Sequence, residues 1–378
     1  MARAHPFCLC LLIWFIVYSS GEELDALLKR VCGAQFGRSR NISTLNNAVV
    51  VTAANYGYMN HVRNFKCFTD RLGLQVLFFA LDARVHDLVS RTMNDSFHSY
   101  LLMPPSTVPA TRIHGSDVEE TLQIRAAKQS SLLIEEGSAM YHTHQFHVIT
   151  TRKLEAVSMV LQSGYDVLFI DTDVVLLQDP FPYILYKNVD YIFSINKPCP
   201  WTRGLDFFNP QDEGNSGLVY FRATPLIRAL LQTVIEAAPT YPGLDDQSIF
   251  WRVLRQFAAA NENSIVALPR CRDFNYSGPI QARRAGTDKT DIIKFVNSTA
   301  NNRRIVLCPL DECAFAVGAF RGTAFAVLQR ELARRNMQAV ALHCNWLKGN
   351  AAKQQALEKH GYWLAGVEGS GTCKPLRT

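Results

Sequence analysis

The sequence lacks the marks of several common protein classes. It contains no low-complexity tract and no internal repeat, and its 48% hydrophobic and 19% charged residues exclude a collagen-like, coiled-coil or mainly disordered chain. No dense run of Lys or Arg of the kind that binds nucleic acid is present. Beyond residue 18, no apolar segment reaches the roughly 20 residues that a membrane-spanning helix needs. What remains is a chain of 378 residues, long enough for one large or two modest domains with a sizeable core.

The positive charge is concentrated in the last third of the chain. The formal net charge is +6, yet residues 252–377 carry 19 Lys and Arg against 9 Asp and Glu. A basic segment of this kind suits an anionic ligand, although a solvated basic surface explains most of these charges.

Residues 1–21 have the layout of a secretory signal. Arg3 and His5 precede a 12-residue apolar run, Phe7–Tyr18, and small residues follow it up to Gly21. The run is too short to span a bilayer with ease. We therefore expect a cleaved signal peptide or a single N-terminal signal anchor. Either places the rest of the chain in the secretory pathway, with the Golgi lumen as the expected location.

Glycosylation and cysteine patterns agree with a lumenal compartment. The chain has four Asn-X-Ser/Thr acceptor patterns, at Asn41, Asn94, Asn275 and Asn297. Apart from the N-terminal run, an even number of cysteines remains, which favours disulfides in an oxidising compartment but does not reveal their pairing. These eight are Cys32, Cys67, Cys199, Cys271, Cys308, Cys313, Cys344 and Cys373. Their spacing does not match that of a zinc site.

Apolar runs alternate with helical patterns along most of the chain. Ala48–Ala53 and Gln75–Leu81 read as strands buried on both faces, with a helix near Met59–Asp70 between them. This order predicts a parallel α/β sheet. Further helices are expected at residues 84–93, 118–135, 148–162, 225–238, 246–259 and 325–332, and further strands at 166–170, 191–195, 217–222 and 339–342.

We predict one large α/β domain with insertions at residues 48–365. Its sheet is expected to be doubly wound and mainly parallel, with helices on both faces. Residues 22–47 would form a stem or lead-in, and residues 366–378 a C-terminal tail. Ligands of such sheets bind beyond the carboxyl ends of the strands.

Two carboxylates follow a short apolar strand in the middle of the chain. Asp171 and Asp173 come directly after Val167–Ile170. Alternation along an extended chain would place them on the same side, roughly 6–7 Å apart. Carboxylates this close are costly to bury unpaired, and a divalent cation such as Mn²⁺ or Mg²⁺ removes the penalty. Aspartates that only cap a turn are the simpler interpretation of a short pattern, but the position at a strand end favours the metal site.

The residues around this pair form a longer pattern. It comprises Gly164–Pro182 (GYDVLFIDTDVVLLQDPFP), then Asn215-Ser-Gly217, Asp245-Asp-Gln247 and His343–Gly349 (HCNWLKG). In this order the segments resemble the nucleotide-diphospho-sugar transferases of glycosyltransferase family 77, over about Val49 to Trp363. The resemblance implies a GT-A-like fold and a nucleoside-diphosphate sugar donor, with a UDP-sugar expected. It also implies a cation, Mn²⁺ or Mg²⁺, a glycan or glycoprotein acceptor, and retention of the anomeric configuration.

The resemblance also implies roles for particular residues. Asp171, Asp173 and His343 would hold the cation. The other candidates for donor binding are Thr52, Ala53, Asn55, Tyr56, Lys153, Thr172, Asn215 and Lys348. The candidate catalytic residues are Asp245, Asp246 and Gln247, and each aspartate either attacks the sugar or only orients it. A cation and a lysine at the diphosphate would stabilise the negative charge that develops on the leaving group.

Simpler interpretations stand beside these roles. Asp246 is also suited to capping its helix, and Tyr56 to packing in the core. Haloacid-dehalogenase phosphatases likewise place Asp-X-Asp after an apolar strand, with the first aspartate as nucleophile. In this chain Val174 and Val175 stand where such a phosphatase has a Gly-Thr-type turn. A catalytically inactive sugar-binding scaffold is the non-enzymatic alternative.

Overall fold

The computed structural model describes residues 23–33, 47–93, 95–102, 143–184, 188–260, 264–268, 270–271, 304–366 and 372–376. Eight strands within these residues form a twisted sheet. They are β1 (Ala48–Ala54), β2 (Val76–Ala80), β3 (Phe97–Leu101), β4 (Asp166–Ile170), β6 (Tyr191–Ile195), β7 (Gly214–Phe221), β8 (Ile265–Ala267) and β9 (Ile305–Pro309). Their order is β3-β2-β1-β4-β7-β6-β9-β8. Strand β7 is antiparallel to β4 and β6, and the other neighbouring pairs are parallel.

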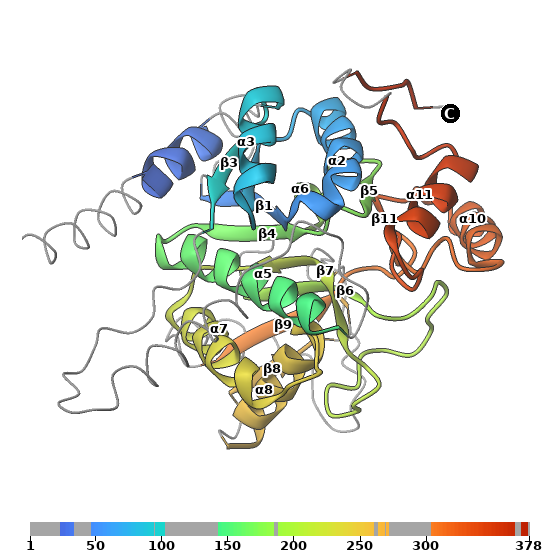
Figure 1. Cartoon of the computed structure of the whole chain (residues 1–378). Coiled ribbons are helices and arrows are strands. Elements are labelled where there is room, and N and C mark those ends of the chain that lie inside the picture. The colour runs from blue at the N-terminus through green and yellow to red at the C-terminus, as the bar shows by residue number, and fades with distance from the viewer. Residues whose placement is uncertain are drawn as a thin grey trace, which may run out of the picture.

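Helices cover both faces of this sheet (Figure 1). They are α2 (Met59–Leu72), α3 (Ala83–Thr92), α5 (His144–Gln162), α6 (Phe181–Ile184), α7 (Pro225–Ala237), α8 (Asp246–Ala260), α10 (Ala324–Arg334) and α11 (Asn350–Lys359), with short 3-10 turns at Tyr56–Tyr58 and Ala238–Thr240. Because side chains alternate along a strand, Val50 packs with the core under α2 and α3, whereas Val49 and Val51 pack under α5, α7 and α8. The predicted α/β class with a mainly parallel sheet and helices on both faces is confirmed.

A second, smaller sheet brings distant parts of the chain together. It consists of β10 (Phe315–Val317), β11 (Ala341–His343) and β5 (Val174–Leu176) in that order. Strand β11 is antiparallel to β5, with His343 opposite Val174. The pairing therefore places residue 343 beside the segment that follows β4. The sequence predicted a strand at 339–342, but it did not predict that this strand pairs with β5.

Most predicted elements have counterparts within two or three residues. The helix expected at 225–238 begins where Thr224 accepts a hydrogen bond from the Ile227 amide, with proline at the first turn. Helix α5 begins four residues earlier than expected, because Thr143 caps it. The helix expected at 118–135 lies outside the described residues.

The lead-in before the sheet contains a packed helix at residues 23–33. Leu24, Leu28 and Val31 are buried in the same core as α5 and α7. A solvated stem would not bury these side chains, and sequence reasoning did not predict this docking. None of the helices in the described residues is both long and apolar enough to cross a lipid bilayer. The N-terminal apolar run and the four glycosylation acceptors lie outside those residues.

The expected disulfides form, but not from every cysteine. Within the described residues Cys67 pairs with Cys373, Cys199 with Cys313, and Cys271 with Cys308. Cys32 and Cys344 are buried free thiols. They belong to the cores on opposite faces of the sheet, so they cannot reach each other. The expectation of disulfides is therefore confirmed, and two of the eight cysteines stay outside them.

Candidate active site

The acidic pair lies at the carboxyl end of β4, but not in an extended chain. The strand ends at Ile170, and residues 171–174 form a turn in which the Val174 amide donates to the Asp171 carbonyl. The expected strand alternation is therefore not what brings the two carboxylates together. The turn brings Asp171 and Asp173 together instead, and the Asp171 amide is held by the Gly217 carbonyl at 2.7 Å.

His343 reaches Asp173 through the small sheet. Its Nε2 lies 3.1 Å from Asp173 Oδ1, and the next amide, that of Cys344, donates to the Asp173 carbonyl at 3.1 Å. Gly217 makes room for the imidazole, because a Cβ at this position would lie 2.1 Å from His343 Cε1. Glycine in the Asn215-Ser-Gly217 segment is thus explained by the close approach of a ring.

Two lysines compensate the carboxylates. Lys153 on α5 lies 2.8 Å from Asp171 and 3.4 Å from Asp246, and Lys353 on α11 lies 2.7 Å from Asp173 Oδ2. Burial disfavours the charged form of both lysines, yet the carboxylates outweigh it and raise the pKa of each. Burial likewise opposes ionisation of Asp173, but Lys353 and His343 hold its pKa well below the ordinary value. Asp173 and both lysines are therefore charged and paired within the protein.

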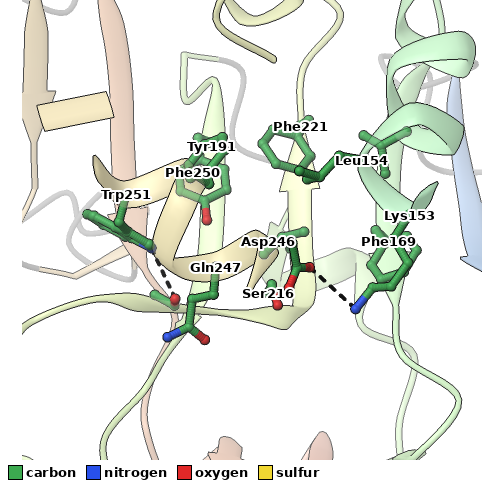
Figure 2. Close-up of a pocket in the computed structure, with 13 residues that line it drawn as sticks. Lys153, Leu154, Phe169, Tyr191, Ser216, Phe221, Asp246, Gln247, Phe250 and Trp251 are labelled. Carbon is green, nitrogen blue, oxygen red and sulfur yellow. Dashed lines mark hydrogen bonds and ion pairs between the residues drawn. The ribbon is translucent and has the colours of Figure 1, made fainter. Parts of the chain in front are cut away.

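Asp246 lies at the back of the cluster against an apolar wall. Figure 2 shows Lys153 reaching toward it from one side, with Tyr191 and Phe250 above it and Trp251 on the other side. These residues belong to the lining of a small cavity of about 20 Å³, enough for one water molecule. Burial raises the pKa of the Asp246 carboxyl, and Lys153 opposes this shift. A carboxylate in this setting is shielded from bulk water.

Asp245 and Gln247 are placed by the start of α8. The Asp245 side chain accepts the Ser248 amide at 2.8 Å, so Asp245, rather than Asp246, caps the helix. Gln247 accepts a hydrogen bond from Asn215 Nδ2 at 3.3 Å, and Asn215 Oδ1 accepts the Gly217 amide. The second and third segments of the sequence pattern therefore meet beside the first.

These side chains line one cleft of about 330 Å³. The predicted residues in its lining are Ala53, Lys153, Asp171, Thr172, Asp173, Asn215, Asp245, Asp246, Gln247, His343 and Lys348. Thr52, Asn55 and Tyr56 are not part of the lining. Thr52 and Asn55 are fully buried, and the Arg84 guanidinium lies 3.6 Å from the centre of the Tyr56 ring.

The residues present fit a divalent cation. Ligand atoms of Asp171, Asp173 and His343 all lie within 4.8 Å of one another. Carboxylate oxygens and an imidazole nitrogen suit Mn²⁺ or Mg²⁺, with nitrogen favouring the former. His343 Nδ1 is buried without a hydrogen-bond partner among the described residues, so the ring is not committed to another structural contact.

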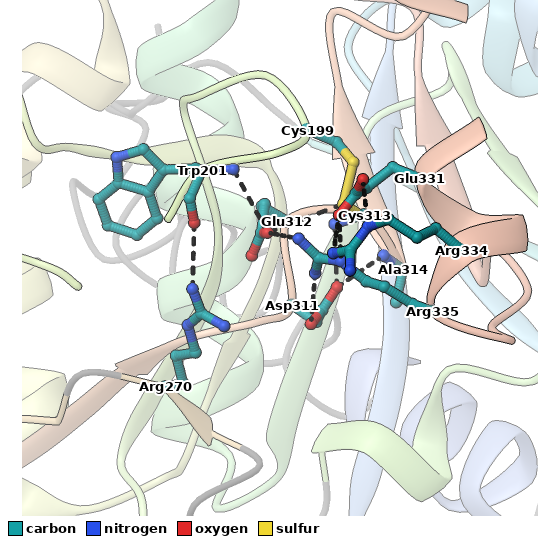
Figure 3. Close-up of a disulfide and its surroundings, with 10 residues drawn as sticks. All are labelled: Cys199, Trp201, Arg270, Asp311, Glu312, Cys313, Ala314, Glu331, Arg334 and Arg335. Carbon is teal, nitrogen blue, oxygen red and sulfur yellow. Dashed lines mark hydrogen bonds and ion pairs between the residues drawn. A yellow bond between two sulfur atoms is a disulfide. The ribbon is translucent and has the colours of Figure 1, made fainter. Parts of the chain in front are cut away.

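A second acidic cluster at Asp311, Glu312 and Cys313 has a different purpose. Cys313 is bonded to Cys199, and Arg335 pairs with both carboxylates, at 3.6 Å from Asp311 and 2.9 Å from Glu312 (Figure 3). Asp311 also accepts the amides of Cys313 and Ala314. These contacts hold a loop in place. The Cys313 sulfur is part of a disulfide, so it is not available as a thiolate ligand for a metal ion.

Sequence reasoning gave no role to Lys353 or Trp346, although both line the cleft. Lys353 lies ten positions after His343 on α11, and no spacing rule singles it out. Trp346 stands inside the His343–Gly349 segment but carried no predicted role; it lines the cleft and is 37% exposed. The only signal for Lys353 was its position, one turn into a helix that begins beside the site.

Comparison with known proteins bears on the same region. The family described as nucleotide-diphospho-sugar transferase matches residues 126–357, more than half of the chain. No curated protein matches the sequence at a significant level.

Three solved structures are similar to this chain at low identity. An active-site mutant of LgtC is 12% identical, over 82% of this chain and 95% of that one, with a TM-score of 0.35. The glycosyltransferase GlyE of Streptococcus pneumoniae TIGR4 is 10% identical, over 88% of this chain and 65% of that one, with a TM-score of 0.33. Mouse xyloside xylosyltransferase 1 in its apo form is 11% identical, over 79% of this chain and 98% of that one, with a TM-score of 0.35.

Proposed function

Because the chain belongs to the nucleotide-diphospho-sugar transferase family, we propose that it is a metal-dependent, retaining glycosyltransferase that uses a UDP-sugar. The observation that carries this proposal is the convergence of Asp171, Asp173 and His343 at one end of the cleft. A haloacid-dehalogenase phosphatase does not account for the family match. The acceptor would be a glycan or a glycoprotein, and no nucleic acid is involved.

Donor binding follows from the charges in the cleft. Asp171, Asp173 and His343 would hold Mn²⁺ or Mg²⁺. That cation would supply the positive charge that the diphosphate needs as it leaves. Lys348 is exposed at the cleft and is free to reach the phosphates. The floor at the end of β1, with Ala53 and Ala54, would take the nucleoside.

The sugar would lie over Asn215, Asp246 and Gln247. Asp246 is the better of the two candidate acids, because its neighbour Asp245 is engaged in capping α8. Asp246 is anchored by Lys153 and backed by aromatic rings that shield it from bulk water. A group held in this way is suited to orienting the sugar or to stabilising positive charge on it.

Narrower assignments rest on the sequence. Membership of glycosyltransferase family 77 is proposed from the resemblance of Gly164–Pro182 and the segments that follow. Location in the Golgi lumen, as a type II membrane protein or a cleaved lumenal protein, is proposed from the N-terminal pattern. The three disulfides support an oxidising compartment.

Calorimetry of UDP binding tests the proposal. We expect the wild-type protein to bind UDP with Mn²⁺ and far more weakly in EDTA, and Asp173→Asn to lose the Mn²⁺-dependent part. Asp311→Asn is the matched control, since Asp311 also follows a buried strand but is paired with Arg335. A screen of nucleotide sugars for release of free nucleotide then identifies the donor.

Loss of folding must be separated from loss of the site. Asp173→Asn leaves Lys353 without its carboxylate, so thermal unfolding of this variant and of the double variant with Lys353→Met should accompany the calorimetry. Wild-type protein that folds but binds no UDP with Mn²⁺ would instead support an inactive scaffold.

A further inference from the structure

Trp346 is a large aromatic side chain that the fold leaves open at the cleft. Among the described residues, the exposed large hydrophobic side chains are Tyr183, Phe208 and Trp346. Of these three, Trp346 lines the cleft, where 37% of it is exposed. Tyr183 and Phe208 are not part of that lining.

The position of this ring is fixed at a cost to the backbone. Trp346 has a φ of 64°, a left-handed conformation that is rare for a bulky residue and is retained at functional sites at a cost of about 1–3 kcal/mol. Its Nε1 donates to Asn196 Oδ1 at 3.2 Å. The six-membered ring lies against Gly318, where a Cβ would approach to 2.1 Å of Cε3. The ring is therefore held rigidly while part of its surface remains free.

The sheet order places Trp346 away from the nucleoside end of the cleft. Strands β1, β4, β7 and β6 are consecutive neighbours, and β1, β4 and β6 end at the edge where β7 begins. Along this edge lie Ala54 at the end of β1, then Asp171 after β4, then Asn215 in β7, and finally Asn196 after β6. Trp346 is bonded to Asn196. The same loop continues to Asn350, which donates to the Gly57 carbonyl at the β1 side at 2.8 Å.

We propose that Trp346 is the platform on which the ring of the acceptor sugar stacks. This inference rests on the proposed function, which puts the nucleoside at β1 and the transferred sugar over β7. The acceptor must then approach from the β6 side, beyond the sugar. The C–H groups on one face of a pyranose ring match an exposed aromatic surface, while its hydroxyls keep hydrogen bonds to water and to polar groups such as Asn196 and Asn345.

Ligand-observed saturation-transfer NMR tests the platform directly. The probes are methyl glycosides of common pentoses and hexoses, measured with and without UDP and Mg²⁺, which avoids the line broadening that Mn²⁺ causes. We expect at least one glycoside to show saturation with the wild-type protein. With Trp346→Ala its binding should weaken about tenfold, and Trp346→Phe should retain most of it. Phe208→Ala, an exposed aromatic outside the cleft lining, should leave binding unchanged.

Affinity for UDP is measured on the same samples to keep the two proposals apart. Intact Mg²⁺-dependent UDP binding in wild type and Trp346→Ala, together with the selective loss of the glycoside, supports the platform. UDP binding with no glycoside signal in wild type, or equal signals in wild type and Trp346→Ala, would overturn it while leaving the transferase proposal in place. Absence of UDP binding in wild type counts against the transferase; glycoside binding that still depends on Trp346 would then support the platform alone.

Discussion

At the residue scale, the charge balance around Asp173 decides how this site behaves before any ligand arrives. One oxygen of Asp173 faces His343 and the other faces Lys353, so both are engaged within the protein. A cation that takes Asp173 as a ligand must compete with the Lys353 ammonium. In the absence of a cation, these contacts stabilise the folded site with its carboxylates close together. The same contacts lower the affinity of the site for a metal ion.

Replacing Lys353 separates these two effects. In Lys353→Met, Asp173 loses its part-buried partner; breaking a fully buried pair costs about 3–5 kcal/mol of folding stability, which is the upper bound here. We expect a lower melting temperature without metal. We also expect Mn²⁺, without nucleotide, to bind about tenfold more tightly by calorimetry and to restore stability by linkage. Lys359→Met, an exposed lysine of the same helix, is the control. Unchanged or weaker Mn²⁺ binding in Lys353→Met would show that the lysine does not compete.

Gly217 is a second residue whose effect should be visible in metal binding. A methyl group there would lie 2.1 Å from the His343 ring, so Gly217→Ala must displace the imidazole. Overpacking of this kind costs about 1–3 kcal/mol. We expect a folded protein with Mn²⁺ affinity reduced about tenfold in calorimetry. Gly33→Ala, where no atom lies within 4 Å of the added Cβ, should bind as wild type does. Equal affinity in both variants would mean that His343 is not a ligand.

At the scale of elements, local sequence patterns correctly predicted the strands and helices whose structure depends mainly on their own residues. Strands β1 and β6 are largely apolar and fully buried, and α7 begins with Thr-Pro, a strong start signal. The meeting of His343 with Asp173 depends on the antiparallel pairing of β11 with β5, between segments about 170 residues apart. No local pattern contains that pairing. The proposed role of His343 was therefore available only from the resemblance to a family.

The helix at residues 23–33 is a second case in which the local sequence did not reveal a contact with distant parts of the chain. From the sequence, residues 22–47 read as a stem or lead-in, because nothing in them indicates which surface they will contact. In the fold, Leu28 is fully buried in the core shared with α5. The contribution of this helix to the free energy of unfolding therefore decides whether the folded unit begins near residue 23 or near residue 48.

Truncating one side chain of this helix answers that question. We expect Leu28→Ala to lower the free energy of unfolding by about 2–5 kcal/mol in urea titrations, because it leaves a cavity in a close-packed core. Lys29→Ala changes the neighbouring residue, whose side chain is 69% exposed, and should cost little. If Leu28→Ala is as stable as Lys29→Ala, residues 23–33 are a stem and not part of the folded unit.

At the scale of the whole molecule, the disulfides join segments that are distant in sequence. Cys67 on α2 is bonded to Cys373, 306 positions later, which fastens the C-terminal segment to the first half of the fold. Cys199–Cys313 ties the loop after β6 to the segment that also carries Asp311 and Glu312. Pairings of this kind depend on the finished topology, and for that reason an even cysteine count did not reveal them.

The two free thiols supply a test of this arrangement. Burial, with smaller contributions from nearby carboxylates, raises the pKa of Cys32 and of Cys344 to about 12. The thiolate is the reactive form, so at pH 8 both thiols are protonated as well as covered. We expect a chain of residues 22–378 to react with Ellman's reagent only after unfolding in guanidinium, and then at two thiols. Prior reduction should raise this to all eight cysteines. Fast reaction of the native protein, or none after unfolding without reductant, would mean that Cys32 and Cys344 are not the buried free pair on opposite faces of the sheet.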